Sequence, residues 1–322
     1  MKLRPVIPLA AVLALLAAGC SSAASAPASS AAAATIPLLK VGLASSFPNL
    51  DLAKTINANS VDVLTLDTLM KFGPQGQVEP NLATSVTQPD PVTYVYHLRH
   101  GVRFWNGDPL TATDVAYSMN HERAPGSQVG FTYASVKSIT ATDPYTVAVT
   151  LTHPDATWKY TAAEYNSAIF EMKFAQAHQG TFGGSRALIM GSGPWKIDSF
   201  DPTKGAELSA NPHWWGGKVP VSHISFTFFS SATSEALAFR AGNIDLAPDI
   251  SQPQSFAATS GAKLIRVPSC SNTWFAMNTQ VAPWSDIHVR RAVAYALNRT
   301  DIIAARTRAG STTPPSPRGS SR

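Results

Sequence analysis

Patterns typical of strands and helices alternate along most of this chain. Residues 94–98 and 145–151 show the two-residue period of half-buried strands. Between them, Thr111 and Asp114 fit a capping box in which Asp replaces the usual Glu, and they predict a helix that runs to Met119. An alternation of this kind predicts an α/β or α+β body.

Further elements are expected from the same patterns. Strands are expected at residues 38–44, 195–200, 223–229, 263–267 and 273–277, and helices at residues 60–70, 234–240 and 287–297. Gly242 follows the second of these helices in the position of a C-terminal cap. The sequence has no repeat of fixed period and no heptad pattern, which excludes solenoid and coiled-coil architectures.

The formal charge of +5 does not belong to the body of the chain. Six of the 25 Lys and Arg residues lie in residues 1–20 and 306–322, which contain no acid. Residues 21–305 therefore carry 19 basic against 20 acidic side chains, and no basic stripe runs along them. This distribution of charge argues against a nucleic-acid partner.

Residues 1–20 have the form of an export signal, in which Lys2 and Arg4 precede an apolar run that ends at Cys20. The run is too short to span a bilayer comfortably. Its end, LLAAGC, resembles a lipoprotein signal, which implies acylation of Cys20 and anchoring to the outer face of the cell membrane. The Ala- and Ser-rich residues 21–36 would then be a flexible tether. The alternative is a plain secretory signal with an incidental cysteine; the protein is exported, membrane-anchored or periplasmic, in either case.

Acylation of Cys20 would leave Cys270 as the only other cysteine of the sequence. No internal disulfide could then form. No nucleophile motif surrounds Cys270, so a partly buried, inert thiol is favoured over a reactive one.

The composition changes at residue 306. Residues 306–322 contain no Leu, Ile, Val or aromatic side chain and cannot bury anything. The change comes directly after residues 301–305 have begun a new apolar helical pattern. We favour a frameshift or a premature truncation as its origin, with a natural disordered tail as the alternative.

Four segments of the chain form a specific series. They are NLATSVTQPDPVTYVYHLRHGVRFWNGDPLTATDVAYSMN (81–120), GSGPWKIDSFDPTKGAELSANPHWWGGKVPVSHISF (191–226), FRAGNIDLA (239–247) and FAMNTQVAPWSDIHVRRAVAYALNR (275–299). In sequence and order, the series resembles the family 5 extracellular solute-binding proteins. These are the oligopeptide-, dipeptide- and nickel-binding components of ABC importers.

The resemblance implies a periplasmic-binding-protein-like α/β fold of the large, type II-like kind, in which two lobes close on a ligand about a hinge. Residues 37–72 and 185–270 would form lobe I, with residues 73–184 inserted as a subdomain. Residues 271–305 would supply a hinge strand, at 271–278, and the start of lobe II. Most of lobe II follows this point in the family, so the second lobe is expected to be incomplete here.

Two stretches of the second segment also have a structural interpretation. In GSGPWK, Gly191, Gly193 and Pro194 are expected to shape a segment that carries the chain from one subdomain back to another. In PHWWGG, Trp214 and Trp215 are expected to cover the edge of a core rather than contact a ligand.

By position, the resemblance also implies ligand contacts in three places. These are Asn57 and Asn59 in the segment Thr55 to Asn59, Phe131 and Tyr133 in a loop that reaches the cleft, and Thr273, Trp274 and Phe275 on the hinge strand. Asn57 and Asn59 fit turn and helix-cap roles better, and Trp274 fits cleft lining and core packing equally. In such proteins the peptide backbone is held as an extended strand, with its side chains in hydrated pockets.

The sequence contains no GxxxxGK[ST], GxGxxG, HExxH or CxxC motif. His121 and Glu122 lack the second histidine of a zincin site, and the other histidines are scattered. We therefore expect no catalytic residues, no metal and no other cofactor, and we do not expect an enzyme.

The resemblance implies a binding protein, expected to be a monomer, that captures an oligopeptide or another small polar solute. Its partners would be the permease subunits of an ABC importer in the membrane; the sequence does not name the solute. The alternative class is a lipid-tethered exported hydrolase or adhesion module, which an assembled nucleophile, base and oxyanion site would favour. A non-functional truncated fragment, with apolar lobe surface exposed to water, is a further alternative.

Overall fold

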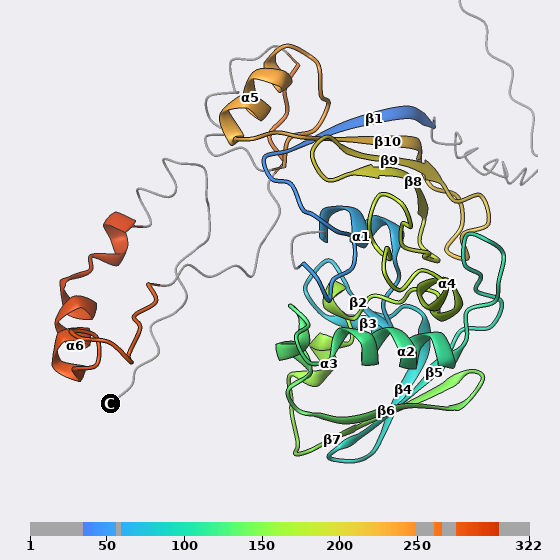
Figure 1. Cartoon of the computed structure of the whole chain (residues 1–322), viewed down its shortest axis with the longest axis horizontal. Helices are drawn as coiled ribbons and strands as arrows, with labels where there is room; N and C mark the ends of the chain where they lie inside the picture. The colour runs from blue at the N-terminus through green and yellow to red at the C-terminus, as the bar shows by residue number, and fades with distance from the viewer. Residues whose placement is uncertain (1–34, 56–58, 249–260, 266–274, 303–322) are drawn as a thin grey trace, which may run out of the picture. The chain divides into compact units, whose positions relative to one another are not determined.

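The computed structural model describes residues 35–55, 59–248, 261–265 and 275–302. The chain divides into one unit of residues 1–34 and a second of residues 35–322, and every described residue belongs to the second. This second unit combines two four-stranded sheets, one two-stranded sheet and short helices (Figure 1), so the expected α/β class is confirmed.

The first sheet joins the beginning of the body to a segment far along the chain. Strand β1 (Ile36–Leu43) runs parallel to β10 (Val221–Phe228). Strands β9 (Gly205–Ala210) and β8 (Trp195–Asp201) follow as antiparallel neighbours, in the order β1-β10-β9-β8. The chain between β1 and β8 therefore leaves this sheet and returns to it.

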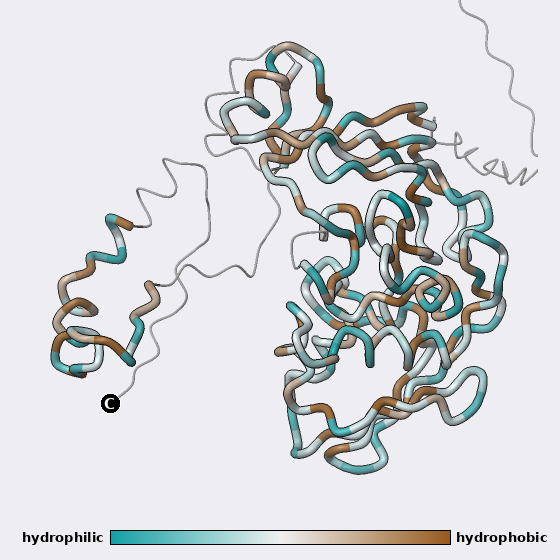
Figure 2. Tube along the Cα trace, viewed as in Figure 1, coloured by the Kyte–Doolittle hydropathy of each residue, from teal (hydrophilic) through white to brown (hydrophobic). Residues whose placement is uncertain are grey.

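The second sheet is antiparallel and lies within that excursion. Its strands are β4 (Ala83–Asp90), β5 (Thr93–Leu98), β7 (Thr146–Leu151) and β6 (Val136–Asp143), in this spatial order. Helix α2 (Ala112–Glu122) packs against β6 and β7. Buried and partly buried residues alternate along β7 because one face of the sheet meets the helix. Figure 2 shows the matching alternation of hydrophobic and hydrophilic residues along these strands.

The predicted capping box begins α2. The amide of Thr111 donates to Asp114 Oδ2 at 2.9 Å, so Asp takes the place of Glu as expected. Asp114 Oδ1 also accepts the amide of Met172 at 3.1 Å, at the start of α4 (Met172–Ala177). The helix continues to Glu122, beyond the predicted end at Met119.

Two hydrophobic clusters form the interior of the body. In the first cluster, around the β1-β10-β9-β8 sheet, Phe47 stacks on Phe200 with ring centroids 5.4 Å apart. The second cluster lies between α2 and its sheet and contains Tyr96 and Trp158, both almost completely buried. Each sheet thus has its own core.

The remaining described elements are short. They are α1 (Asn59–Thr65), β2 (Met70–Phe72), β3 (Val78–Pro80), the 3-10 turns η1 (Gly130–Tyr133) and η2 (Tyr165–Ser167), α3 (Trp158–Thr161), α5 (Ala232–Arg240) and α6 (Ile287–Ala296). The predicted helices at 234–240 and 287–297 correspond to α5 and α6. Gly242 has a φ of 72°, as expected for a residue that caps α5. Hydrophobic residues recur along α6 (Figure 2), yet the described residues bury none of its side chains.

One expectation about the elements is wrong, and two expected strands are not formed by their described residues. The helix expected at 60–70 ends at Thr65, because Asp67 turns inward to bridge with Ile169 and Met70 begins β2. The strand expected at 263–267 is absent from its described residues 263–265, which have no ladder partner. The hinge strand expected at 271–278 is likewise absent from residues 275–278, and its other positions lie outside the described residues.

The glycines of GSGPWK allow a close crossing of two backbones. A Cβ built on Gly191 would lie against the Thr65 carbonyl oxygen and 2.7 Å from Leu66 Cδ2. The carbonyl of Gly193 accepts the Trp105 indole N–H at 3.3 Å. The returning chain therefore passes directly over the end of α1, just before β8 begins.

The indole of Trp215 covers the edge of the second cluster, as expected for PHWWGG, and it donates a hydrogen bond to a buried carboxylate there. Its Nε1 donates to Asp67 Oδ2 at 3.0 Å, and the Ser192 hydroxyl donates to the same oxygen at 2.8 Å. The Arg99 guanidinium lies 4.4 Å from the Trp215 ring centroid, a cation–π contact. Burial raises the pKa of Asp67, although these hydrogen bonds and the Arg99 charge act in the opposite direction.

Gly191→Ala tests the close crossing. The new methyl group would press on the Thr65 carbonyl and the Leu66 side chain, and we expect it to lower the free energy of unfolding by about 1–3 kcal/mol. Gly180→Ala is the matched control, because a Cβ at that exposed position meets nothing within 4 Å. Urea unfolding of both variants measures the difference. Equal stability of the two variants would contradict the crossing.

Candidate functional site

The loop that leads from β1 towards α1 is fastened to the rest of the body. The amide of Leu50 donates to the Gly183 carbonyl at 2.7 Å, and the amide of Gln128 donates to the Ala53 carbonyl at 2.9 Å. Gly183 has a φ of +76°, and a Cβ there would lie 2.6 Å from the Asp51 amide. The loop therefore approaches two distant segments too closely to move freely.

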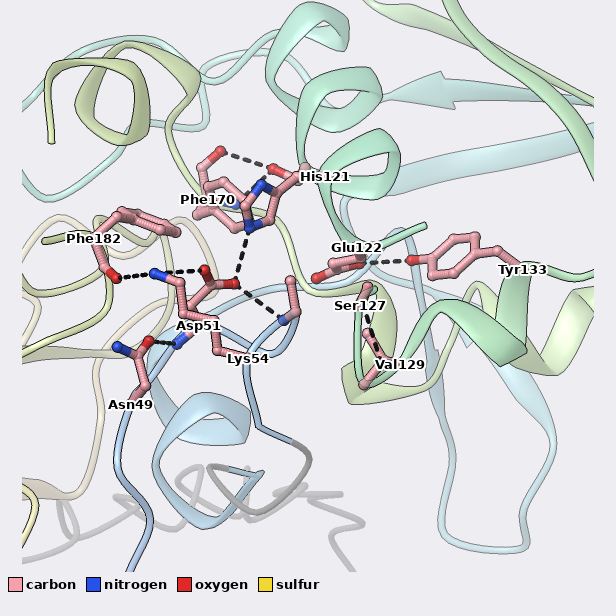
Figure 3. Close-up of polar contacts among 12 residues, drawn as sticks. Asn49, Asp51, Lys54, His121, Glu122, Ser127, Val129, Tyr133, Phe170 and Phe182 are labelled. Carbon is pink, nitrogen blue, oxygen red and sulfur yellow. Dashed lines mark hydrogen bonds and ion pairs between the residues drawn. The ribbon is translucent and has the colours of Figure 1, made fainter. Parts of the chain in front are cut away.

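Asp51 is the polar centre of this loop (Figure 3). One carboxylate oxygen lies 2.9 Å from His121 Nε2, and the other lies 3.3 Å from Lys54 Nζ. The Lys54 ammonium also donates to the Phe182 carbonyl at 3.0 Å. Burial alone would raise the pKa of Asp51, but the His121 hydrogen bond and charge, with Lys54 and the Ala53 amide, lower it below its usual value.

Aromatic rings surround the partner of Asp51. The edge-on rings of Phe170 and Phe182 lie 5.5 and 6.1 Å from the His121 ring, measured between centroids. They confine the imidazole of α2 on the side that faces the Asp51 loop (Figure 3). The arrangement ties the Asp51 loop to the end of α2 through a partly buried hydrogen bond.

Turn η1 carries the two aromatic residues expected at the cleft, and one of them is exposed while the other is buried. The Phe131 side chain is 70% exposed, whereas Tyr133 is only 3% exposed. The Tyr133 hydroxyl lies 2.6 Å from Glu122 Oε2 and 3.0 Å from the Asn166 carbonyl oxygen. A 3-10 turn advances about 120° per residue, so positions two apart cannot share one face. Tyr133 therefore anchors the turn from within, and only Phe131 is available to a ligand from this pair.

The other expected contact residues are divided between described and undescribed parts of the chain. Asn59 is the first residue of α1. The Phe275 side chain is 59% exposed, and its ring lies 6.1 Å from the Trp284 ring. Three expected contacts and the expected lipidation site lie outside the described residues: Asn57, Thr273, Trp274 and Cys20. The structure thus brings Phe131 and the Asp51 loop into one fastened unit.

Sequence reasoning missed Asp51 and the roles of His121 and Glu122. The only available signal for Asp51 was its position two residues after Asn49, whose side chain accepts the Asp51 amide at 2.8 Å. An Asn at that position often forms a local turn. His121 and Glu122 were compared with a zinc motif, whereas they bind Asp51 and Tyr133.

These polar groups hold the Asp51 loop and turn η1 in place. Within the described residues, no group of three or more His, Cys, Asp or Glu side chains could hold a metal ion. None of the helices in the described part of the chain is long and apolar enough to cross a membrane. The fastened loop and the anchored turn offer a fixed backbone and one exposed aromatic ring to a partner.

Tyr133→Phe tests the anchoring of η1. Removing the hydroxyl leaves buried oxygens of Glu122 and Asn166 without this partner, and we expect a loss of about 1–3 kcal/mol in unfolding free energy. Tyr160→Phe is the matched control on a 40% exposed tyrosine and should change stability by less than about 0.5 kcal/mol. Urea titrations give both values. A Tyr133→Phe variant as stable as the control would contradict the anchor.

Comparison with known sequences places the chain among bacterial binding proteins. It is 27% identical over 280 residues to the probable D,D-dipeptide-binding periplasmic protein DdpA of Escherichia coli, covering 83% of this chain and 54% of that protein. It is 24% identical over 262 residues to the oligopeptide-binding protein OppA of Bacillus subtilis, covering 74% and 48%. The chain spans about half the length of the curated relatives it matches.

Solved structures show the same fold. The periplasmic binding protein DppA of Helicobacter pylori, in complex with the peptide STSA, superposes with a TM-score of 0.71 at 23% identity, covering 84% of this chain and 58% of that chain. OppA of Burkholderia pseudomallei gives a TM-score of 0.73 at 19% identity, covering 85% and 58%. The periplasmic-binding-protein-like architecture is therefore confirmed.

A family match covers most of the chain. It spans residues 77–321 and is described as "Bacterial extracellular solute-binding proteins, family 5 Middle". This range includes the whole second sheet, α2 with His121 and Glu122, and η1 with Phe131. The chain belongs to the family 5 bacterial extracellular solute-binding proteins.

Proposed function

We propose that this chain supplies the first-lobe part of the substrate-binding component of an ABC importer. It would capture a peptide or a similar small solute in a cleft between lobes and deliver it to the permease. Membership of a solute-binding family supports this proposal, as do the peptide-binding names of the relatives. The same membership supports action by binding rather than by catalysis.

The observation that carries the proposal is the exposed Phe131 on an anchored turn. An aromatic ring that is 70% exposed to solvent is available for contact with a partner. Glu122 and Asn166 hold Tyr133, two residues away, so the ring is presented with little loss of freedom on binding. The loop through Ala53, which bonds to Gln128 just before this turn, leads to the expected contact segment Thr55 to Asn59.

The limits of the lobes belong to this proposal. We assign residues 37–72 and 185–270 to lobe I, because β1 pairs with β10 in one sheet. Residues 73–184 form the inserted subdomain, supported by the second sheet and its own hydrophobic cluster. Residues 271–305 would begin the second lobe.

The solute class that we favour is a peptide. DppA of Helicobacter pylori was solved with a peptide, whereas NikZ of Campylobacter jejuni was solved with Ni(L-His) and has a TM-score of 0.71 to this chain. An aromatic contact with a fixed backbone fits an extended peptide, which is bound mainly through its main chain. A membrane anchor at Cys20, by acylation, would hold the protein beside its permease.

Phe131→Ala tests the contact with ligand. We expect the variant to bind a hydrophobic peptide about tenfold more weakly than the wild-type chain, because a central aromatic contact contributes more than about 1 kcal/mol. Isothermal titration of the full chain with a panel of di- to pentapeptides and with nickel–histidine measures the affinities.

Phe72→Ala is the matched control, on an aromatic of β2 that is 44% exposed. It should leave the affinity unchanged, and circular dichroism of both variants should match that of the wild type. Binding of nickel–histidine but of no peptide would overturn the peptide assignment. An equal effect of both substitutions would remove Phe131 from the site.

A further inference from the structure

Helix α1 contains a buried carboxyl group, that of Asp62, which has no hydrogen-bond partner among the described residues. Asp62 has an exposed fraction of 0%, and neither of its carboxylate oxygens has a hydrogen-bond partner within the described part of the chain. Leaving an ionised carboxylate in this state would cost several kcal/mol of desolvation. The group must therefore be neutral or must find compensation from a nearby cation.

The two basic side chains of this junction are already engaged elsewhere. His121 Nε2 and Lys54 Nζ both pair with Asp51, at 2.9 and 3.3 Å. The Lys54 ammonium additionally donates to the Phe182 carbonyl at 3.0 Å. Asp51 itself faces Asp62 as a like charge and so disfavours its ionisation.

Glu122 gives independent geometric evidence for a retained proton. Its Oε2 lies 2.6 Å from the Tyr133 hydroxyl, which also lies 3.0 Å from the Asn166 carbonyl oxygen. A phenol has one proton and can donate to only one of these oxygens. The carbonyl can only accept, so both contacts are satisfied together when Glu122 is protonated and donates to the Tyr133 oxygen.

Ionisable groups reach this region from the elements around α1. They are Asp51 and Lys54 of the preceding loop, Tyr117, His121 and Glu122 of α2, Tyr133 of η1, Glu164 beside η2, and Lys196, Asp198 and Asp201 of β8, which also packs against α1. Acidic side chains outnumber basic ones, and Lys54 and His121 both pair with Asp51. The imbalance leaves the remaining carboxyl groups to be neutralised by protons.

We propose that Asp62 and Glu122 are retained as neutral acids and form a proton-dependent latch that keeps α1 seated against β8 and η2. Burial, with the charge of Asp51, raises the pKa of Asp62 well above its usual value. Burial and the charges of Asp51 and Asp62 raise the pKa of Glu122 in the same direction, although the Tyr133 hydrogen bond acts against the shift. The latch is closed when both protons are in place.

The direction of the pH effect follows from these raised pKa values. Below the usual carboxyl values both the folded and the unfolded chain hold the protons, and the contribution to stability is complete. As the pH rises from there towards the raised folded-state values, only the folded chain retains them, and stability falls. Asp51 has the opposite behaviour, because its lowered pKa contributes stability that is lost as the pH falls.

The latch bears on binding because α1 begins at Asn59, directly after the expected contact segment. This consequence rests on the proposed function, whereas the latch itself does not. Alkaline release of α1 would weaken the capture of ligand, because Asn59 is one of the expected contacts.

The test compares urea unfolding from pH 5 to pH 9 for the wild-type full chain, Asp62→Asn, Glu122→Gln and the double variant. The amides imitate the neutral acids, and the Gln amide can still donate to Tyr133. Each retained proton should raise the wild-type unfolding constant by up to about tenfold per pH unit, until the folded-state pKa is reached. Each single variant should lose the pH dependence of the unfolding constant that comes from one proton, and the double variant should lose the contributions of both protons.

Asp198→Asn, on an exposed position of β8, is the matched control and should keep the wild-type pH dependence. Hydrogen exchange of residues 59–65 should quicken with pH beyond its intrinsic rate in the wild type but not in the double variant. Infrared difference spectra report the protons directly, even if Asp62→Asn does not fold. A protonated-carboxyl band at neutral pH that Glu122→Gln removes is the expected result.

Parallel pH profiles for the wild type and the double variant would overturn the proposal, as would the absence of that infrared band. Peptide affinity measured across the same pH range separates the two proposals. A latch without any peptide binding would contradict the proposed function alone, and pH-independent stability with intact binding would contradict the latch alone.

Discussion

The parallel pairing of β1 with β10 is the constraint on which the rest of the body depends. It places residues 36–43 beside residues 221–228, with β9 and β8 as the next strands of the same sheet, so the chain between β1 and β8 leaves the first sheet and returns to it. The outgoing path is the Asp51 loop and the returning path is the crossing segment through Gly191. Both paths meet at the end of α1, where only a residue without a side chain fits against the Thr65 carbonyl. The inserted sheet can build its own core because this double passage fixes its ends.

The buried acids follow from the same passage. Where the outgoing chain leaves the first core, the carboxyl groups of Asp51 and Asp62 are almost completely buried, and so is that of Glu122 on α2. Asp51 is stabilised there by a histidine and a lysine, and its pKa is lowered. Within the part of the chain that the structure describes, no basic side chain pairs with Asp62 or Glu122, and protonation is the remaining way to hold a carboxyl in an apolar setting. One junction thus contains carboxyl groups with opposite responses to pH.

Much of the fold could be predicted from local patterns, because local physics decides those elements. Alternation marks β5 and β7, and the Thr111–Asp114 capping box fixes the beginning of α2. Strand β4 was not anticipated, since almost all of its side chains are exposed and its order comes from pairing with β5. The helix expected at 60–70 is too long, because Asp67 is drawn inward by Trp215 and Ser192 from distant parts of the chain. Such contacts are tertiary and leave no periodic trace in the sequence.

The same limit on prediction from the sequence applies to single side chains of the candidate site. A resemblance transfers positions along a chain, and Phe131 and Tyr133 were transferred together. Their orientations depend on the turn between them, and a 3-10 turn directs residues two apart to different sides. The hydroxyl of Tyr133 then decides which ring is buried, because it finds two oxygen partners inside the body whereas Phe131 has no polar group to satisfy. An exposed ring with a buried, hydrogen-bonded neighbour is therefore held in place without being covered, which is the physical condition for a contact residue on a binding surface.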